Sequence, residues 1–218
     1  MKGLSKETAQ VFESIKDIEI FNDYLLIGGS ALAMQIGHRL SEDLDFCKWH
    51  DDPGLKNEEV NWPEIEAALS KLGRVDTDVL DLHQVSFVLD EVKLSFYSNA
   101  LADSRDIESE ISFNRIHLAN LKSLGAMKLE VMSRRNIFRD YYDVFSILQE
   151  GISIKEIVTL CGRYSRHRMK SKMILSLISN GSLFRYEEDF ELLHPKYPVN
   201  SEEIETYIRQ QIAKEFGW

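Results

Sequence analysis

The sequence predicts an α+β protein in which a mixed sheet with flanking helices is followed by an α-helical bundle domain. Two observations support this prediction. Short β-like runs bounded by turn residues dominate the chain up to about residue 117, and from Leu118 onward the apolar residues recur almost entirely at helical spacing. The change of period is not marked by a flexible linker. We therefore expect an α/β domain at residues 1–117 and an α-helical domain at residues 118–218.

The first domain is expected to alternate helices and short strands. Asp90-Glu91 lies between two β-like runs and predicts a hairpin turn, and Asn61 is the expected cap of a helix. The expected helices are 5–21, Ser30–Ile36 and Pro63–Leu72, and the expected strands are Tyr24–Ile27, Leu44–Cys47, Val75–Leu80, Gln84–Leu89 and Val92–Tyr97.

The second domain is expected to be helical throughout. Ser153 and Ser201 precede two of its helices and are the predicted N-caps, because a serine hydroxyl accepts hydrogen bonds from the first free N–H groups. The expected helices are Leu121–Met132, Phe138–Gln149, Ile154–Cys161, Met169–Ile178 and Glu202–Phe216.

Composition narrows the classes of protein. The 218 residues are 44% hydrophobic, which is enough for a real core, and no apolar run approaches the roughly 20 residues that span a bilayer. Cys47 and Cys161 are far apart in the sequence, so we expect two reduced thiols in a cytoplasmic protein. The net charge of −10 argues against a general nucleic-acid binder.

Charge is distributed unevenly along the chain. Residues Arg115–Lys172 carry 12 Lys and Arg against 5 Asp and Glu, a local balance of +7, and the remaining residues carry −17. This basic segment is either the solvated face of ordinary helices or a surface for triphosphate or RNA. Its densest part predicts an acceptor-binding surface made by Arg163, Arg166, Arg168, Lys170 and Lys172.

The most informative segment joins a glycine-rich turn to two aspartates. Gly28-Gly29-Ser30 ends a predicted strand and opens a helix, so it presents N–H groups and a helix dipole to an anion. Asp43 and Asp45 begin the next strand and share a face at period two, which suits Mg²⁺. Each feature alone is common, as an ordinary turn or a solvated surface. Their order and spacing indicate a phosphate cradle beside a carboxylate pair.

These residues resemble the first two motifs of the AbiEii/AbiGii toxin family, within the DNA polymerase β-like nucleotidyltransferase superfamily. The similar segments are Gly28–Leu32 and Arg39–Phe46. A third similarity lies downstream, in Ala126-Met127-Lys128-Leu129 and Arg139-Asp140-Tyr141-Tyr142-Asp143. The resemblance spans residues 26 to 143, about half of the chain, and implies a nucleotidyltransferase fold.

The resemblance also implies roles for individual residues. Asp43 and Asp45 would hold Mg²⁺, and the helical domain would contribute Lys128 and Asp140 to the cleft, with Lys128 reaching the triphosphate. Asp143 would be a second carboxylate or a structural partner, while the alternative for both aspartates is an ion pair with Arg135 or Arg139. The remaining nucleotide-binding residues would be Gly28, Gly29, Ser30 and Arg39, and Arg39 pairs either with a phosphate or with Asp43.

The implied partners are an NTP, an RNA (for example tRNA) or protein acceptor, and an antitoxin protein, with no membrane involved. One position departs from the superfamily pattern: Ser95 stands on the strand where a third carboxylate is expected. A hydroxyl is a weak Mg²⁺ ligand, and Asp90 or Glu91 would substitute only if the hairpin turn reached the site. Either Asp140 replaces the missing group, or the protein is a non-catalytic nucleotide-binding or interaction module.

Overall fold

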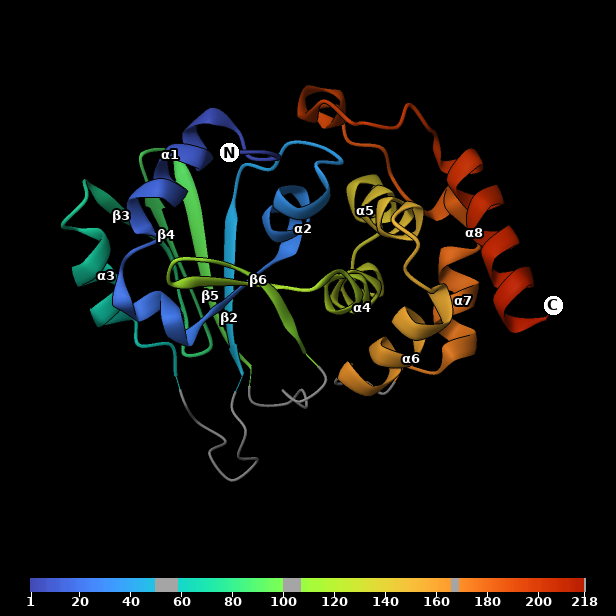
Figure 1. The fold of residues 1–218 in the computed structure, drawn as a ribbon, viewed down its shortest axis with the longest axis horizontal. Helices are drawn as coiled ribbons and strands as arrows, with labels where there is room; N and C mark the ends of the chain where they lie inside the picture. The colour runs from blue at the N-terminus through green and yellow to red at the C-terminus, as the bar shows by residue number, and fades with distance from the viewer. Residues whose placement is uncertain (50–58, 100–106, 166–168, 218) are drawn as a thin grey trace. The chain divides into compact units, whose positions relative to one another are not determined.

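The computed structural model describes residues 1–49, 59–99, 107–165 and 169–217. The chain divides into two compact units, Met1–Asn120 and Leu121–Trp218, which are described separately (Figure 1).

The first unit is built on a mixed sheet of seven strands in the order β3-β4-β5-β2-β1-β7-β6. β2 lies between β1, its antiparallel partner, and β5, its parallel partner. The sheet confirms the predicted α+β class. The strands are β1 (Leu25–Ile27), β2 (Leu44–Trp49), β3 (Val75–Leu80), β4 (Gln84–Leu89), β5 (Val92–Asn99), β6 (Ser109–Phe113) and β7 (Ile116–Ala119).

The turn between β4 and β5 confirms the predicted hairpin. Asp90 and Glu91 have φ values of 49° and 67°, and Leu89 pairs with Val92 across the turn. Two consecutive residues with positive φ match the right-handed twist of the flanking strands.

β6 and β7 were not among the expected strands. They form an antiparallel hairpin at the sheet edge, and β7 also pairs in parallel with β1. Because the pairing of β7 continues through Ala119, the first unit ends at Asn120 rather than at residue 117.

Helices α1 (Lys6–Ile15), α2 (Gly28–Ile36) and α3 (Trp62–Leu69) complete this unit. The predicted N-terminal helix ends early, because the chain turns into a 3₁₀ segment, Glu19–Asp23, that buries Phe21. Phe21 contacts Phe46 on β2 and Phe96 on β5, whose rings stack on each other. The aromatic core therefore lies on one face of these strands, and the residues that alternate with Phe46 and Phe96 lie on the other.

The second unit is helical in its described residues. It comprises α4 (Leu121–Met132), α5 (Phe138–Gln149), α6 (Ile154–Tyr164), α7 (Ser171–Ile178) and α8 (Ser201–Phe216). Ser153 caps α6 as expected, accepting a hydrogen bond from the Glu156 N–H. The predicted cap Ser201 is wrong by one position. Asn200 caps α8 in a capping box with Glu203. Its side-chain oxygen accepts hydrogen bonds from N–H groups of the first turn, and the Glu203 side chain accepts one from the Asn200 N–H.

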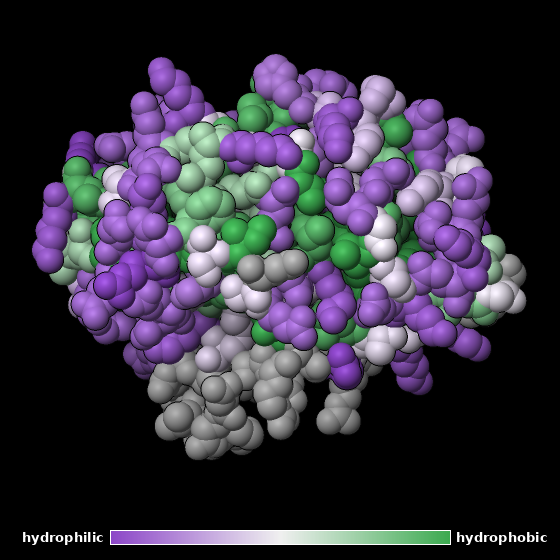
Figure 2. Space-filling view, viewed as in Figure 1, coloured by the Kyte–Doolittle hydropathy of each residue, from purple (hydrophilic) through white to green (hydrophobic). Residues whose placement is uncertain are grey.

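Hydrophilic residues cover most of the face of each unit seen in Figure 2. Within the described ranges, no helix is long and apolar enough to cross a membrane. Cys47 and Cys161 are both buried.

Candidate functional site

The two aspartates lie at the start of β2, on the face opposite the aromatic core. Asp45 pairs with Ile27 of β1 on one side and with Ser95 of β5 on the other. Asp43 directly precedes the strand and is exposed, and Asp45 is half-buried. At period two both carboxylates lie on the same face, so the structure brings them together where solvent reaches them.

The glycine turn lies directly against this pair. Gly28 has a φ of +71°, and a Cβ at this position would lie 2.6 Å from Oδ2 of Asp45. The Ser30 hydroxyl donates a hydrogen bond to the carbonyl of Asp43. The cradle and the carboxylate pair are therefore one site, in which Ser30 fixes the approach to β2.

The N-terminus of α2 lies beside the carboxylate pair and carries groups that could hold an anion. Its N-cap residue, Ile27, has no side-chain acceptor for the N–H groups of the first turn. A Cβ on Gly29 would lie 2.8 Å from Nη2 of Arg39, whose guanidinium is almost completely buried and donates through Nη1 to the Leu40 carbonyl. A helix dipole, free N–H groups and a buried guanidinium together form a favourable place for phosphate.

Replacing Gly28 by alanine tests the close approach. Any side chain here adopts a left-handed backbone at a cost of about 1–2 kcal/mol, and its Cβ displaces the Asp45 carboxylate. We expect Gly28→Ala to lose Mg²⁺-dependent NTP binding in calorimetry. Gly151→Ala is the matched control, since Gly151 has a φ of +85° with nothing within 4 Å of its Cβ position. Equal NTP affinity in the two variants would contradict the proposed contact.

Ser95 occupies the third strand position of the site. It lies directly opposite Asp45, is buried, and accepts a hydrogen bond of 3.2 Å from the Ser86 hydroxyl. Among the described residues there is no group of three or more His, Cys, Asp or Glu side chains that could hold a metal ion, so Asp90 and Glu91 do not complete the pair.

Two carboxylates still fit Mg²⁺. The ion keeps several waters in proteins, and its usual ligands are one or two carboxylates together with substrate phosphates. The exposed Asp43 and the half-buried Asp45 provide the two carboxylates, and the adjacent anion cradle would hold the substrate phosphates that provide the other oxygens.

A lysine missed by the sequence reasoning lies on the same face. Leu44 pairs with Leu94 and Asp45 with Ser95, so Asp43 and Lys93, one residue earlier on each strand, are neighbours. Lys93 Nζ lies 2.6 Å from Oδ2 of Asp78 on β3. The hydrogen bond to Asp78 raises the pKa of Lys93, and the charges of Asp43 and Asp45 act in the same direction. The sequence contained one sign of this placement: Lys93 lies two residues before Ser95, so the two side chains share a face of the strand.

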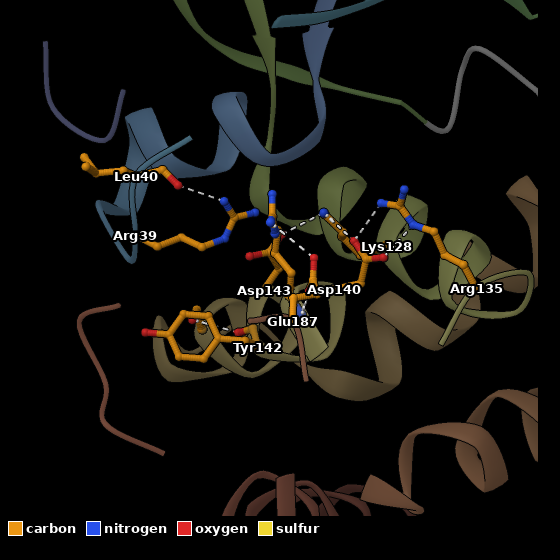
Figure 3. A network of polar contacts seen from close by, with 10 residues as sticks. Arg39, Leu40, Lys128, Arg135, Asp140, Tyr142, Asp143 and Glu187 are labelled. Carbon is orange, nitrogen blue, oxygen red and sulfur yellow. Dashed lines mark hydrogen bonds and ion pairs between the residues drawn. The ribbon is translucent and has the colours of Figure 1, made fainter. Parts of the chain in front are cut away.

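The second unit holds the other predicted site residues in a compact ionic cluster (Figure 3). Lys128 on α4 lies 2.8 Å from Oδ1 of Asp140 and 2.7 Å from Oδ2 of Asp143, both on α5 and both fully buried. Arg135 Nε lies 2.8 Å from Oδ2 of Asp140. The ion pair between Asp140 and Arg135 was one of the expected alternatives, whereas Arg139 lies 3.2 Å from Glu187.

The cluster defines what Asp140 can do. Burial alone would raise the pKa of its carboxyl, but the ammonium of Lys128 and the guanidinium of Arg135 outweigh burial and hold that pKa below its usual range. Lys128 and Arg135 engage both of its oxygens. This geometry favours Asp140 and Asp143 as residues that position the Lys128 ammonium.

The predicted acceptor-binding residues are only partly described. Arg163 lies in the last turn of α6, Lys170 is the N-cap of α7, and Lys172 lies in its first turn. Arg166 and Arg168 fall outside the described residues.

Comparison with known proteins decides the family. The model of the family described as "Nucleotidyl transferase AbiEii toxin, Type IV TA system" matches residues 11–215. The chain belongs to the AbiEii family. As a member of the AbiEii family it is a nucleotidyltransferase, in agreement with the resemblance drawn from its motifs.

Three proteins illustrate the relationship. The uncharacterised protein aq_aa25 of Aquifex aeolicus (strain VF5) is 27% identical over 217 residues, covering 98% of both chains. The nucleotidyltransferase toxin MenT4 of Mycobacterium tuberculosis H37Rv superimposes with a TM-score of 0.59 at 16% identity, over 95% of this chain and 81% of MenT4. A candidate nucleotidyltransferase of H. pylori gives a TM-score of 0.57 at 15% identity, over 98% of each chain. At these identities the two structures show a shared fold.

Proposed function

We propose that this AbiEii-family protein transfers a nucleotidyl group from an NTP to an RNA or protein acceptor, as the toxin of a toxin–antitoxin pair, with Mg²⁺ held by Asp43 and Asp45. One observation carries the proposal: the cradle at Gly28 and the carboxylate of Asp45 are close enough to leave no room for a Cβ between them. A triphosphate bound at the N-terminus of α2 would therefore present its metal-binding oxygens to the aspartates.

Different residues of the chain would bind the phosphates and the metal ion. The N–H groups of Gly29 and Ser30, with Arg39, would hold the phosphates of the leaving group. In the reaction an acceptor hydroxyl oxygen would form a bond to the α-phosphorus and release its proton to solvent, while the bond from the α-phosphorus to the bridging oxygen of the β-phosphate breaks and pyrophosphate leaves. Asp43 and Asp45 would hold Mg²⁺, which would supply positive charge to the phosphates.

We further propose that Lys128 takes part in the same reaction as a fixed positive charge toward the triphosphate. Support comes from its setting, because two buried carboxylates hold its ammonium in one place, and from the match of its segment to the family motif. Asp140 and Asp143 would then act through Lys128.

A transfer assay tests the proposed function. The protein is incubated with Mg²⁺ and each of the four NTPs labelled on the α-phosphate, in the presence of total RNA or of cell protein. Label should appear in one acceptor class and depend on Mg²⁺. Absence of label from both classes, with a protein that still binds NTP, would instead support a nucleotide-binding module.

Ser95 is the observation that favours this second function, and Ser95→Asp separates the two. The new carboxylate would lie opposite Asp45 in the sheet, where it would offer a third ligand to the ion. We expect the transfer rate to rise, by about tenfold or more if one added ligand stabilises the transition state by about 1.4 kcal/mol. Ser95→Asn is the control of similar size without charge. A rate that is unchanged in Ser95→Asp would show that the missing carboxylate does not limit catalysis.

A further inference from the structure

The carboxylate pair of the first unit has two different flanks. Asp45 lies on β2, between β1 and β5 in the sheet. The glycine cradle follows β1 on one side of Asp45. Ser95 and Lys93 lie on β5, on the other side. In nucleotidyl transfer the attacking and leaving oxygens are roughly in line, on opposite sides of the phosphorus. If the leaving phosphates lie at the cradle, the acceptor approaches from the β5 flank.

Lys93 is the cation of that flank. It neighbours Asp43 at the start of β5 and is held by Asp78, which reaches it from β3, two strands away across β4. The side chains of Lys93 and Asp78 are 40% and 45% exposed. An ion pair this exposed is weak and opens readily, so another anion can take the place of Asp78.

We propose that Lys93 binds a backbone phosphate of an RNA acceptor beside the acceptor hydroxyl, and that Asp78 positions its side chain beforehand. The proposal rests on the proposed function, which provides the transfer reaction and its donor side. Lys93 offers a solvent-accessible point charge next to two carboxylates. Those carboxylates would repel a negatively charged acceptor, and the ammonium of Lys93 offsets this repulsion. A phosphodiester is therefore the favoured partner. A protein acceptor has no phosphate chain to place there.

The test compares Lys93→Ala with Lys48→Ala. Lys48 is a lysine of the same sheet and also forms an exposed ion pair, with its Nζ 3.2 Å from Oδ2 of Asp23. It lies on β2 three residues beyond Asp45, which is about 10 Å along the strand and on the opposite face. Affinity for a single-stranded RNA oligonucleotide is measured by fluorescence anisotropy at two salt concentrations. Wild type and Lys48→Ala should bind alike. Lys93→Ala should bind about tenfold more weakly, with the slope of log K against log salt smaller by about 0.7.

Two further measurements define the role. Mg²⁺–NTP binding in calorimetry should not weaken in Lys93→Ala, because the charges of Asp43 and Asp45 interact with Lys93 and its removal leaves them more attractive to a cation. The KM for RNA in the transfer assay should rise, and Lys93→Arg should restore RNA binding. Asp78→Asn should raise the KM for RNA by a smaller factor without changing the KM for NTP.

Several results would overturn the proposal. An equal loss in Lys48→Ala would indicate a general charge effect, and loss of NTP binding in Lys93→Ala would place the lysine on the donor side. Failure of the wild type to bind RNA at low salt would exclude an RNA acceptor at this flank. Each of these leaves the carboxylate site intact, whereas failure of the proposed function would appear as NTP binding that is indifferent to Asp43 and Asp45.

Discussion

Replacing both Asp43 and Asp45 by asparagine should abolish Mg²⁺-dependent NTP binding and reduce nucleotidyl transfer by about a thousandfold or more, since a bound metal supplies several kcal/mol of charge stabilisation. Asparagine keeps the size of each side chain and removes two formal charges. The exposed Asp43 and half-buried Asp45 lie outside the aromatic core, so circular dichroism should report an unchanged fold. Calorimetry with Mg²⁺ and NTP measures the loss directly.

The matched control removes the same net charge elsewhere in the first unit. Glu42→Gln combined with Glu59→Gln changes two exposed acids, one of them next to Asp43 in sequence. In wild type and in this control, Mg²⁺–NTP should raise the melting temperature, because a ligand that binds only the folded state stabilises it. The asparagine variant should show no such rise. Undiminished binding there would remove the basis of the proposed site.

The course of β2 shows how far the sequence could predict this site. Leu44 and Phe46 alternate with Asp43 and Asp45, so the pattern alone placed both carboxylates on one face. The preceding glycines predicted a turn into a helix, because only glycine adopts the positive φ of Gly28 at little cost. These are local properties of a few consecutive residues.

Lys93 and Lys128 mark the limit of that reasoning. Lys93 lies beside the carboxylate pair only because β2 and β5 pair in parallel, which brings together residues about fifty positions apart in the chain. Lys128 lies in an apolar helix, and its pairing with Asp140 and Asp143 depends on how α4 and α5 pack. The β6–β7 hairpin was missed for a related reason, since β7 joins the sheet by pairing in parallel with β1, about ninety positions earlier in the chain.

The second large effect is expected at Lys128. Replacing it by methionine keeps most of the side-chain volume but leaves two fully buried carboxylates with one fewer cation. Removing one partner of a buried ion pair costs about 3–5 kcal/mol, because the remaining buried charge loses the compensation of that partner. Hydrogen exchange of the α4 and α5 amides, which reports local opening within a multi-unit chain, should therefore accelerate strongly.

Lys214→Met is the control for the replacement itself, since Lys214 is exposed on α8, and it should leave exchange in α4 and α5 unchanged. The triple variant Lys128→Met, Asp140→Asn, Asp143→Asn should recover part of the lost protection, because it removes the two buried charges that Lys128 had balanced. If Lys128→Met alone exchanged like wild type, the cluster would not stabilise the second unit.

The direction of the Asp140 pKa adds a pH dependence to this prediction. In the wild type that pKa is held below its usual range by Lys128 and Arg135, against the effect of burial. A carboxyl whose pKa is lowered in the folded state stabilises that state above the unfolded pKa of about 3.9, and this contribution is lost as the pH falls through the folded value.

In Lys128→Met the ammonium is gone and burial acts with less opposition, so the pKa of Asp140 rises. Protonation then removes the buried charge, and the stability difference between wild type and Lys128→Met should be large at pH 7 and shrink as the pH falls toward 4. Urea denaturation at a series of pH values measures this difference. A gap that stays constant or widens on acidification would show that Lys128 stabilises the unit by packing rather than by pairing with Asp140.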